Sequence, residues 1–236
     1  MKNIFKSEKY LDITYSESRA PVNSYPFELG NYILEKHFKG VGKILDIGCG
    51  RGDYLDVFKH YDCEVAGLDL SPNLKKLEEE HEVRFCDLES EKFPFKSETF
   101  DYVFSKSVIE HLNNPTNLFF NAYEVLKEDG VAVIMTPSWE YNYWGPFYID
   151  YTHVTPFTKP SIADAMRFSG FKDVEVYYFY QLPFTWKYPY LKFLCKAIAA
   201  LPLKYRPFYE ANWPDSINKL IRFSKEVMLV AVGRKK

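Results

Sequence analysis

Residues 43–136 alternate short apolar runs with segments of helical periodicity, and this alternation leaves the chain few possible folds. Five of the runs are typical of buried strands, over residues 43–47, 64–68, 83–86, 100–104 and 131–135. Helical segments are predicted between them, over residues 53–60, 71–82 and 115–127. Because alternating strands and helices form βαβ units, we predict an α/β fold around a parallel sheet.

Further elements are predicted on either side of this core. They are a helix over residues 27–38, a loop over 136–157, a helix over 159–169 and strands over 172–180 and 226–232. At 236 residues the chain suits one α/β domain. We expect an N-terminal helical cap (1–42), a core (43–180 and 225–236) and an insertion (181–224).

Composition excludes several classes of protein. A net charge of −2 disfavours a protein that coats nucleic acid, and 47% hydrophobic residues disfavour disorder. The four cysteines show no Cys-x-x-Cys pair or zinc spacing. The sequence lacks a signal-peptide pattern and an apolar run of about 18 residues, the length that a membrane span needs. We therefore expect a cytoplasmic protein.

A glycine-rich loop joins the first strand to the first helix, in the segment Asp46-Ile-Gly48-Cys49-Gly50-Arg-Gly52. Glycines there let a ligand approach the backbone closely, at the strand end where such sheets bind ligands. The dinucleotide fingerprint requires Gly or Ala where this chain has Asp53. In addition, Asp46 would repel a pyrophosphate and attract a cation. A nicotinamide-dependent oxidoreductase is therefore the less favoured interpretation.

Two more aspartates follow the next two strands. Asp69 ends the second strand, where a carboxylate can accept bonds from both hydroxyls of a ribose. Asp87 follows the third, where it can accept a bond from an exocyclic amine such as that of adenine. Together with Asp46 they would serve a cation, a ribose and an aminopurine. S-adenosylmethionine contains all three groups.

At this point the chain resembles a known family. Residues 43–136 are similar to the class I S-adenosylmethionine-dependent methyltransferases. The matching segments are Ile44-Leu-Asp-Ile-Gly-Cys-Gly-Arg-Gly52, Gly67-Leu-Asp-Leu-Ser71, Cys86-Asp-Leu88, Phe100-Asp-Tyr-Val-Phe-Ser105 and Val108-Ile-Glu-His-Leu112.

The resemblance implies a Rossmann-like, doubly wound sheet of seven strands whose last strand is antiparallel. It also implies roles for the cofactor residues. Asp46 and the loop residues Gly48, Cys49, Gly50 and Gly52 would hold the amino-acid part of the cofactor. Asp69 and Leu70 would lie at the ribose, Asp87 and Leu88 at the adenine, and Ser105 beneath the methionine end.

Methyl transfer to oxygen needs positioning and a base. His153 lies in Asp150-Tyr-Thr-His-Val-Thr-Pro-Phe-Thr158, which resembles a loop of small-molecule O-methyltransferases. We predict that His153 is the general base or orients the acceptor, with a pKa near 6–7; the alternative is a hydrogen bond that only fixes the loop. His111 is a second catalytic candidate, although capping or packing is an alternative role. His37, His60 and His81 are expected to be solvated, and we predict no metal site.

The acceptor is constrained mainly by what the sequence lacks. The segment Ser105-Lys-Ser-Val108 has no Asn/Asp-Pro-Pro-Tyr motif, which enzymes that methylate base amines carry, so no nucleic-acid partner is expected. We predict O-methylation of a small-molecule or glycan-type acceptor. A non-catalytic, cofactor-binding partner subunit is the main alternative. The sequence does not indicate an oligomeric state.

The insertion over residues 181–224 is aromatic and basic, with seven positive and two negative residues. It could be a packed cap, a lid over the acceptor, or an attachment to an anionic membrane. Peripheral membrane contact is the least favoured of the three, because the predicted helix is short and its lysines are few. We expect Trp186, Tyr188 and Tyr190 to cover the acceptor side.

Overall fold

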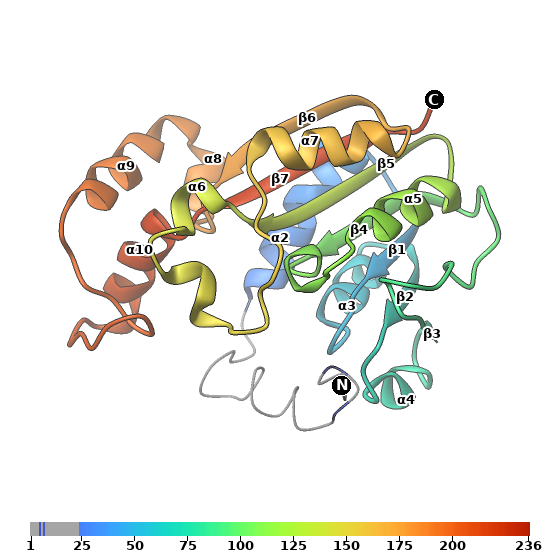
Figure 1. The fold of residues 1–236 in the computed structure, drawn as a ribbon, viewed down its shortest axis with the longest axis horizontal. Coiled ribbons are helices and arrows are strands. Elements are labelled where there is room, and N and C mark those ends of the chain that lie inside the picture. The colour runs from blue at the N-terminus through green and yellow to red at the C-terminus, as the bar shows by residue number, and fades with distance from the viewer. Residues whose placement is uncertain (1–4, 6, 8–23) are drawn as a thin grey trace.

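Seven strands form one sheet in the computed structural model, which describes Phe5, Ser7 and residues 24–236 (Figure 1). Their order is β3-β2-β1-β4-β5-β7-β6. The strands are β1 (Lys43–Ile47), β2 (Glu64–Asp69), β3 (Glu82–Phe85), β4 (Phe100–Lys106), β5 (Leu126–Pro137), β6 (Lys172–Phe179) and β7 (Met228–Arg234). The first five pair in parallel, and β7 runs antiparallel between β5 and β6. The predicted seven-stranded α/β fold with an antiparallel last strand is confirmed.

Helices cover both faces of the sheet, and further helices lie beyond one end of it (Figure 1). The core helices are α2 (Tyr25–Ile33), the π-helical η2 (Leu34–Phe38), α3 (Asp53–His60), α4 (Leu74–Leu77), α5 (Thr116–Val125) and α7 (Lys159–Phe168). Short turns η3 (Ile109–His111), α6 (Trp139–Asn142) and η4 (Pro146–Ile149) follow β4 and β5. The insertion holds α8 (Phe184–Lys187), η5 (Pro189–Leu191), α9 (Lys192–Ala200) and α10 (Asp215–Lys225). None of these described helices has the length and apolarity to cross a bilayer.

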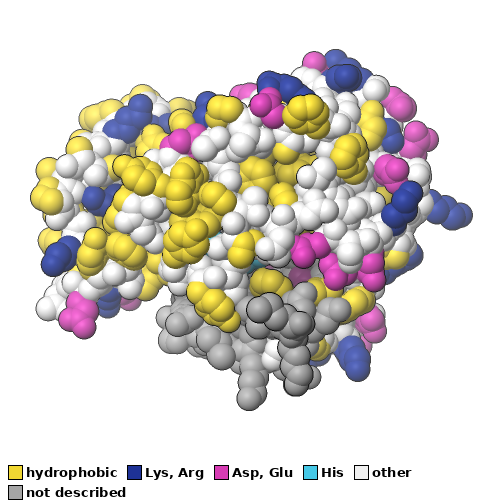
Figure 2. All heavy atoms as spheres, viewed as in Figure 1, with side chains coloured by type: hydrophobic (Ala, Val, Ile, Leu, Met, Phe, Trp, Pro, Cys, Tyr) yellow, Lys and Arg dark blue, Asp and Glu magenta, His cyan; other side chains and the backbone are white. Residues whose placement is uncertain are grey.

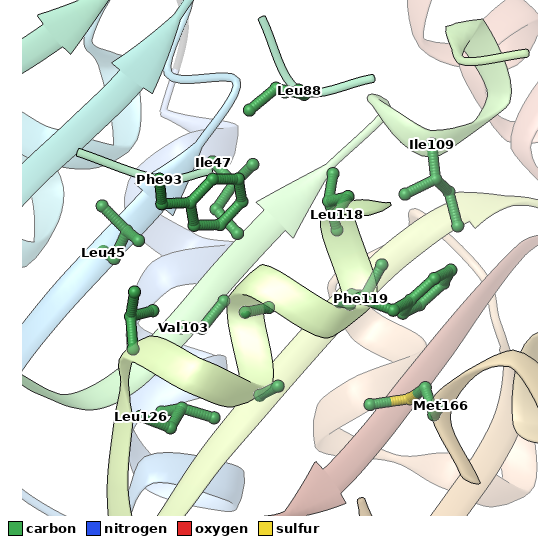
Figure 3. Packing of buried hydrophobic residues seen from close by; sticks show 14 of the residues in the cluster. Leu45, Ile47, Leu88, Phe93, Val103, Ile109, Leu118, Phe119, Leu126 and Met166 are labelled. Carbon is green, nitrogen blue, oxygen red and sulfur yellow. The ribbon is translucent and has the colours of Figure 1, made fainter. Parts of the chain in front are cut away.

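Two apolar layers hold the helices against the sheet. On one face, Leu118 and Phe119 of α5 belong to the same apolar cluster as Leu45 and Ile47 of β1 (Figure 3). On the other, Leu29 of α2 belongs to a cluster with residues of α3, β1 and β4. Because β1 is buried on both faces beyond its first residue, Lys43, the rest of its sequence is apolar except for Asp46.

Several predicted elements end earlier than expected. The helix after β2 spans only Leu74–Leu77 instead of continuing to residue 82. Three consecutive acids, Glu78 to Glu80, follow it, and negative charge at a helix C-terminus opposes the helix dipole. The helix predicted to end at Lys127 ends at Val125, because the chain pairs with β4 from Leu126.

Two histidines that were expected to be solvated are buried. His37 packs on Tyr177 and its Nε2 lies 2.8 Å from the Tyr177 hydroxyl. His81 lies 2.9 Å from the Asp56 carboxylate. Both predictions were wrong for the same reason. Helical spacing shows which face of a helix a residue is on, but not whether a distant element covers that face. His60 is exposed, as predicted.

The prediction for Trp186 is also wrong. Its indole stacks on Phe179 at 5.0 Å, packs at 5.3 Å from Tyr32 of α2, and donates to the carbonyl of Tyr180. It therefore joins the insertion to the sheet and to α2. Tyr188 and Tyr190 are exposed rather than folded over a site. The segment that does reach the loop after β5 is the one around Phe208, which packs on Trp144 at 5.3 Å.

Candidate active site

The glycine loop curls over the carboxyl end of β1. The amides of Gly48 and Cys49 donate to the carbonyl of Leu68 in β2, so the loop is fixed to the neighbouring strand. Gly48 has a φ of 77°, and a Cβ there would come 2.3 Å from Val108. Gly50 has a φ of 53°, yet a Cβ there would meet nothing within 4 Å. The loop therefore faces open space at Gly50, where a ligand can contact the backbone directly.

Asp69 fastens the same loop from β2. Its Oδ2 accepts from the Gly50 amide at 2.8 Å, and its Oδ1 accepts from the Ser71 amide at 2.7 Å. Burial raises the pKa of this carboxyl, while the backbone donors at Gly50, Ser71 and Leu70 act in the opposite direction. A carboxylate anchored in this way presents its remaining lone pairs in a fixed direction.

Asp46 is a buried carboxyl in a largely apolar strand. It is 3% exposed, and burial, followed by the charges of Asp69 and Asp53, raises its pKa to about 8. An acid in this setting resists ionisation until a positive charge is brought to it. The residues thus fit a cationic ligand, because a cation would relieve both the desolvation and the repulsion among the three acids.

The other predicted cofactor residues lie around the same edge. Asp87 follows β3, and its Oδ1 accepts from the Glu89 amide at 3.1 Å. Leu88 is buried in the core cluster, and Cys49 packs its thiol above Gly67, where a Cβ would come 2.8 Å from the sulfur. Ser105 donates to the carbonyl of Ile47 at 3.0 Å, directly before the glycine loop. Gly52 is the N-cap of α3, with a φ of 88°, and Leu70 follows Asp69 at the end of β2.

The two candidate catalytic histidines meet beyond the end of β4. The rings of His111 in η3 and His153 in the loop after η4 pack edge to face, with 4.6 Å between their centroids. Phe5 packs edge to face on His111 at 5.6 Å. The amides of Val154 and Thr155 donate to the carbonyl of Glu110, which ties the loop to η3.

Hydrogen bonds define which nitrogen of each imidazole carries the proton. The Thr152 hydroxyl donates to the Asp150 carboxylate at 2.6 Å, so its oxygen accepts from Nδ1 of His111 at 2.8 Å. Nδ1 of His153 donates to the carbonyl of Phe147 at 2.6 Å. In both neutral rings the lone pair is therefore on Nε2.

Burial keeps these imidazoles neutral. It lowers the pKa of His111 to about 4, with a further contribution from His153, although Asp150 acts in the opposite direction. Burial also lowers the pKa of His153 below its ordinary 6.5, while the Phe147 hydrogen bond and Asp150 act in the opposite direction. A neutral imidazole with a free Nε2 lone pair can accept a proton.

Glu110 and Lys106 are parts of this site that sequence reasoning did not assign. Glu110 accepts from the Thr136 hydroxyl at 2.8 Å through Oε2, while its buried Oε1 has no hydrogen-bond partner among the described residues. Burial raises the pKa of Glu110 to about 7 and lowers the pKa of Lys106. One ligand atom each from Glu110, His111 and His153 lie within 4.8 Å of one another, close enough for a cation to draw them together.

A sequence signal existed for some of the missed residues. Asp150 and Thr152 have the spacing of an Asx turn, in which a carboxylate accepts from the amide two residues on, as it does here at 2.9 Å. Glu110 lies in the family-like segment Val108–Leu112, but that segment did not indicate its hydrogen bond to Thr136. For Lys106 and Phe5 no local signal existed, because their contacts come from distant parts of the chain.

Comparisons with known proteins show the family to which this fold belongs. Residues 19–176 match a family described as a methyltransferase domain. Phosphoethanolamine N-methyltransferase 3 of Arabidopsis thaliana is 34% identical over 100 residues, which are 39% of this chain and 20% of that protein. The mitochondrial ubiquinone biosynthesis O-methyltransferase of Rattus norvegicus is 33% identical over 105 residues, 40% of this chain and 30% of that protein. These matches thus span less than a third of either relative.

A solved structure is similar over nearly the whole chain. A SAM-dependent methyltransferase from Archaeoglobus fulgidus has a TM-score of 0.64 and 22% identity, over 97% of this chain and 100% of that one. At this identity the likeness concerns the fold.

Proposed function

The chain belongs to the methyltransferase-domain family of class I, S-adenosylmethionine-dependent enzymes, and from that premise we propose that it methylates an oxygen of a small-molecule or glycan-type acceptor. S-adenosylmethionine is its cofactor, and when bound it supplies a methyl group activated by a sulfonium. The single observation that carries the oxygen assignment is the neutral His153, whose Nε2 lone pair is free of the Phe147 hydrogen bond.

We assign the cofactor contacts as follows. The carboxyl of Asp46 and the backbone of Gly48, Cys49, Gly50 and Gly52 hold the charged amino-acid part. The raised pKa of the buried Asp46 supports this assignment, because a nearby cation would lower that pKa again. The remaining assignments are Asp69 and Leu70 at the ribose, Asp87 and Leu88 at the adenine, and Ser105 beneath the methionine end.

His153 accepts the proton that the acceptor hydroxyl loses as its oxygen gains the methyl group. With a pKa of about 4, His111 is a weak base near neutral pH, which leaves His153 as the proton acceptor. His111 instead borders the acceptor and keeps its ring fixed through Thr152 and Asp150. Phe5, packed on His111, shields the same space from water. No metal is needed for this step.

An amine acceptor is the second candidate, and the likeness to a phosphoethanolamine N-methyltransferase favours it. A non-catalytic cofactor-binding subunit remains the third candidate function.

We also propose that the protein is cytoplasmic and has no nucleic-acid partner. The support for a reducing compartment is that Cys49, Cys63, Cys86 and Cys195 are all buried and unpaired.

Turnover of labelled S-adenosylmethionine with a panel of hydroxyl and amine acceptors, phosphoethanolamine included, tests the proposal. We expect label in hydroxyl acceptors and a loss of roughly 10²–10⁴-fold in kcat for His153→Gln. His60→Gln is the matched control, since His60 is exposed on α3. Label in amines alone would overturn the oxygen assignment. Cofactor binding without label in any acceptor would favour the non-catalytic subunit.

A further inference from the structure

Exposed apolar side chains are concentrated on one part of the molecule. Of the 19 large apolar side chains exposed in the described residues, six lie in residues 143–154 and eight in residues 188–217. The two segments touch, because Trp144 packs on Tyr205 and Phe208. Figure 2 shows hydrophobic side chains gathered over α6, η4 and the neighbouring insertion, with basic side chains among them. A contiguous apolar area of this kind usually marks an interaction site.

Helix α9 turns an apolar face outward. Cys195 is fully buried toward the molecule, whereas Phe193 is 60% exposed and Leu194 42% exposed. Leu201, just past the helix end, is 51% exposed. A surface helix ordinarily faces solvent with polar residues, so this helix has an unpartnered face. Tyr190 in η5, 69% exposed, extends that face toward the helix start.

Lysines of the same insertion, two of them on α9 itself, lack ion pairs within the described residues. Lys187, Lys192, Lys196 and Lys204 form no ion pair with any residue that the structure describes, in contrast to Arg206, which binds Asp215 at 2.9 Å. The insertion carries seven positive and two negative residues in a chain of net charge −2, so positive charge is segregated onto it. We name the exposed apolar residues of 188–201 together with these four lysines the α9 face.

We propose that the α9 face docks the protein on the surface of an anionic lipid bilayer. Tyrosine and phenylalanine enter the boundary between headgroups and acyl chains, while lysines beside them meet lipid phosphates. A second copy of this chain fits poorly, because a symmetric contact would place the two positive faces against each other. The short predicted helix made this interpretation the weakest from sequence. The structure adds neighbouring aromatic residues that enlarge the surface.

Docking through this face would bring the acceptor side close to the lipid surface. Residues 143–154, which share the apolar area, include the loop that carries His153. Membrane docking is independent of methyl transfer to oxygen, because exposed apolar residues and positive charge alone would produce it.

Flotation of the full chain with lipid vesicles tests the proposal. We expect binding to vesicles of phosphatidylcholine mixed with phosphatidylglycerol that is at least about tenfold stronger than to phosphatidylcholine alone, and that weakens as salt is raised. The variant Phe193→Ser/Leu194→Ser should bind anionic vesicles roughly tenfold more weakly. Phe120→Ser/Phe168→Ser is the matched control, because it removes two exposed apolar side chains from α5 and α7 and should bind like the wild type.

Charge reversal provides a second, independent variant. Lys187→Glu/Lys192→Glu/Lys196→Glu should abolish the preference for anionic vesicles while cofactor affinity, measured by calorimetry, stays unchanged. Equal binding of the wild type to both vesicle types would overturn the proposal. So would a dimer in sedimentation that Phe193→Ser/Leu194→Ser converts to monomer, because the face would then be an interface between two copies.

Discussion

The imidazoles of His111 and His153 pack edge to face with 4.6 Å between their centroids, although one lies after β4 and the other after β5. Each ring is held by its Nδ1, the first through Thr152 and the second through the Phe147 carbonyl. One ligand atom of each ring and a carboxylate oxygen of Glu110 lie within 4.8 Å of one another. The structure thus brings two imidazoles together from segments that follow different strands.

The pH dependence of turnover should reflect the lowered pKa of His153. A base acts when it is unprotonated, so kcat should rise with pH through a value below the ordinary 6.5 and be constant near neutrality. The pH–rate profile of kcat, measured with saturating cofactor and acceptor, checks this. A rise centred above 6.5 would exclude His153, in its buried setting, as the base.

Asp69 should be required for cofactor affinity. Asp69→Ala removes the acceptor for two loop amides and the proposed ribose contact, so affinity should fall by roughly 2–3 kcal/mol. Calorimetry measures the change. Asp69→Asn, which retains one acceptor oxygen, should lose less cofactor affinity. The control is Asp164→Ala, at an exposed site on α7, which should bind the cofactor normally. Unchanged affinity of Asp69→Ala would contradict the assignment.

Asp46 should lower the stability of the cofactor-free protein at neutral pH. Its folded-state pKa of about 8 is raised above the ordinary 3.8. The contribution of this carboxyl to the free energy of unfolding is therefore fully present below pH 3.8 and is lost as the pH rises through 8. Asp46→Asn should therefore be more stable than the wild type at pH 8 by about 1–3 kcal/mol and equal to it at pH 4. The same variant should bind S-adenosylmethionine more weakly. Denaturant unfolding at pH 4 and pH 8 checks the expected stabilities. If Asp46→Asn differs from the wild type by the same free energy of unfolding at both pH values, the expectation is contradicted.

Zinc should inhibit the enzyme, whereas a chelator should not. A Zn²⁺ ion drawn to Glu110, His111 and His153 would occupy the lone pair that His153 needs as a base. We expect reversible inhibition by zinc, restored by EDTA, and full activity of protein treated with EDTA beforehand. Loss of activity on chelation, with recovery on adding a divalent ion, would show instead that this cluster holds a metal required for turnover.

Trp186 should contribute to stability and not to acceptor binding. Its indole is stacked on Phe179 and packed on Tyr32, so Trp186→Ala should lower the free energy of unfolding by about 3–5 kcal/mol. The KM for the acceptor, measured below the unfolding temperature, should stay unchanged. Tyr190→Ala is the control, because that exposed ring should leave stability within about 0.5 kcal/mol.

Local sequence determined the sheet and the edge at which the proposed cofactor residues lie. The run Lys43–Ile47 reads as a buried strand because parallel strands are covered on both faces, and glycines mark the turn that follows it. Asp46 and Asp69 could be placed at one edge because parallel strands all end on the same side. The register between β1 and β2 then brings them together without further information.

Only the tertiary structure decided which side chains meet across distant segments. Helical spacing placed His37 on a surface, yet Tyr177 covers it. Trp186 was expected over the acceptor side, yet it packs on Tyr32 of α2. The contact between His111 and His153, and the unpartnered face of α9, also depend on how loops pack after the sheet has formed. Such contacts are set by shape and desolvation over the whole molecule, and neither leaves a periodic signal in the chain.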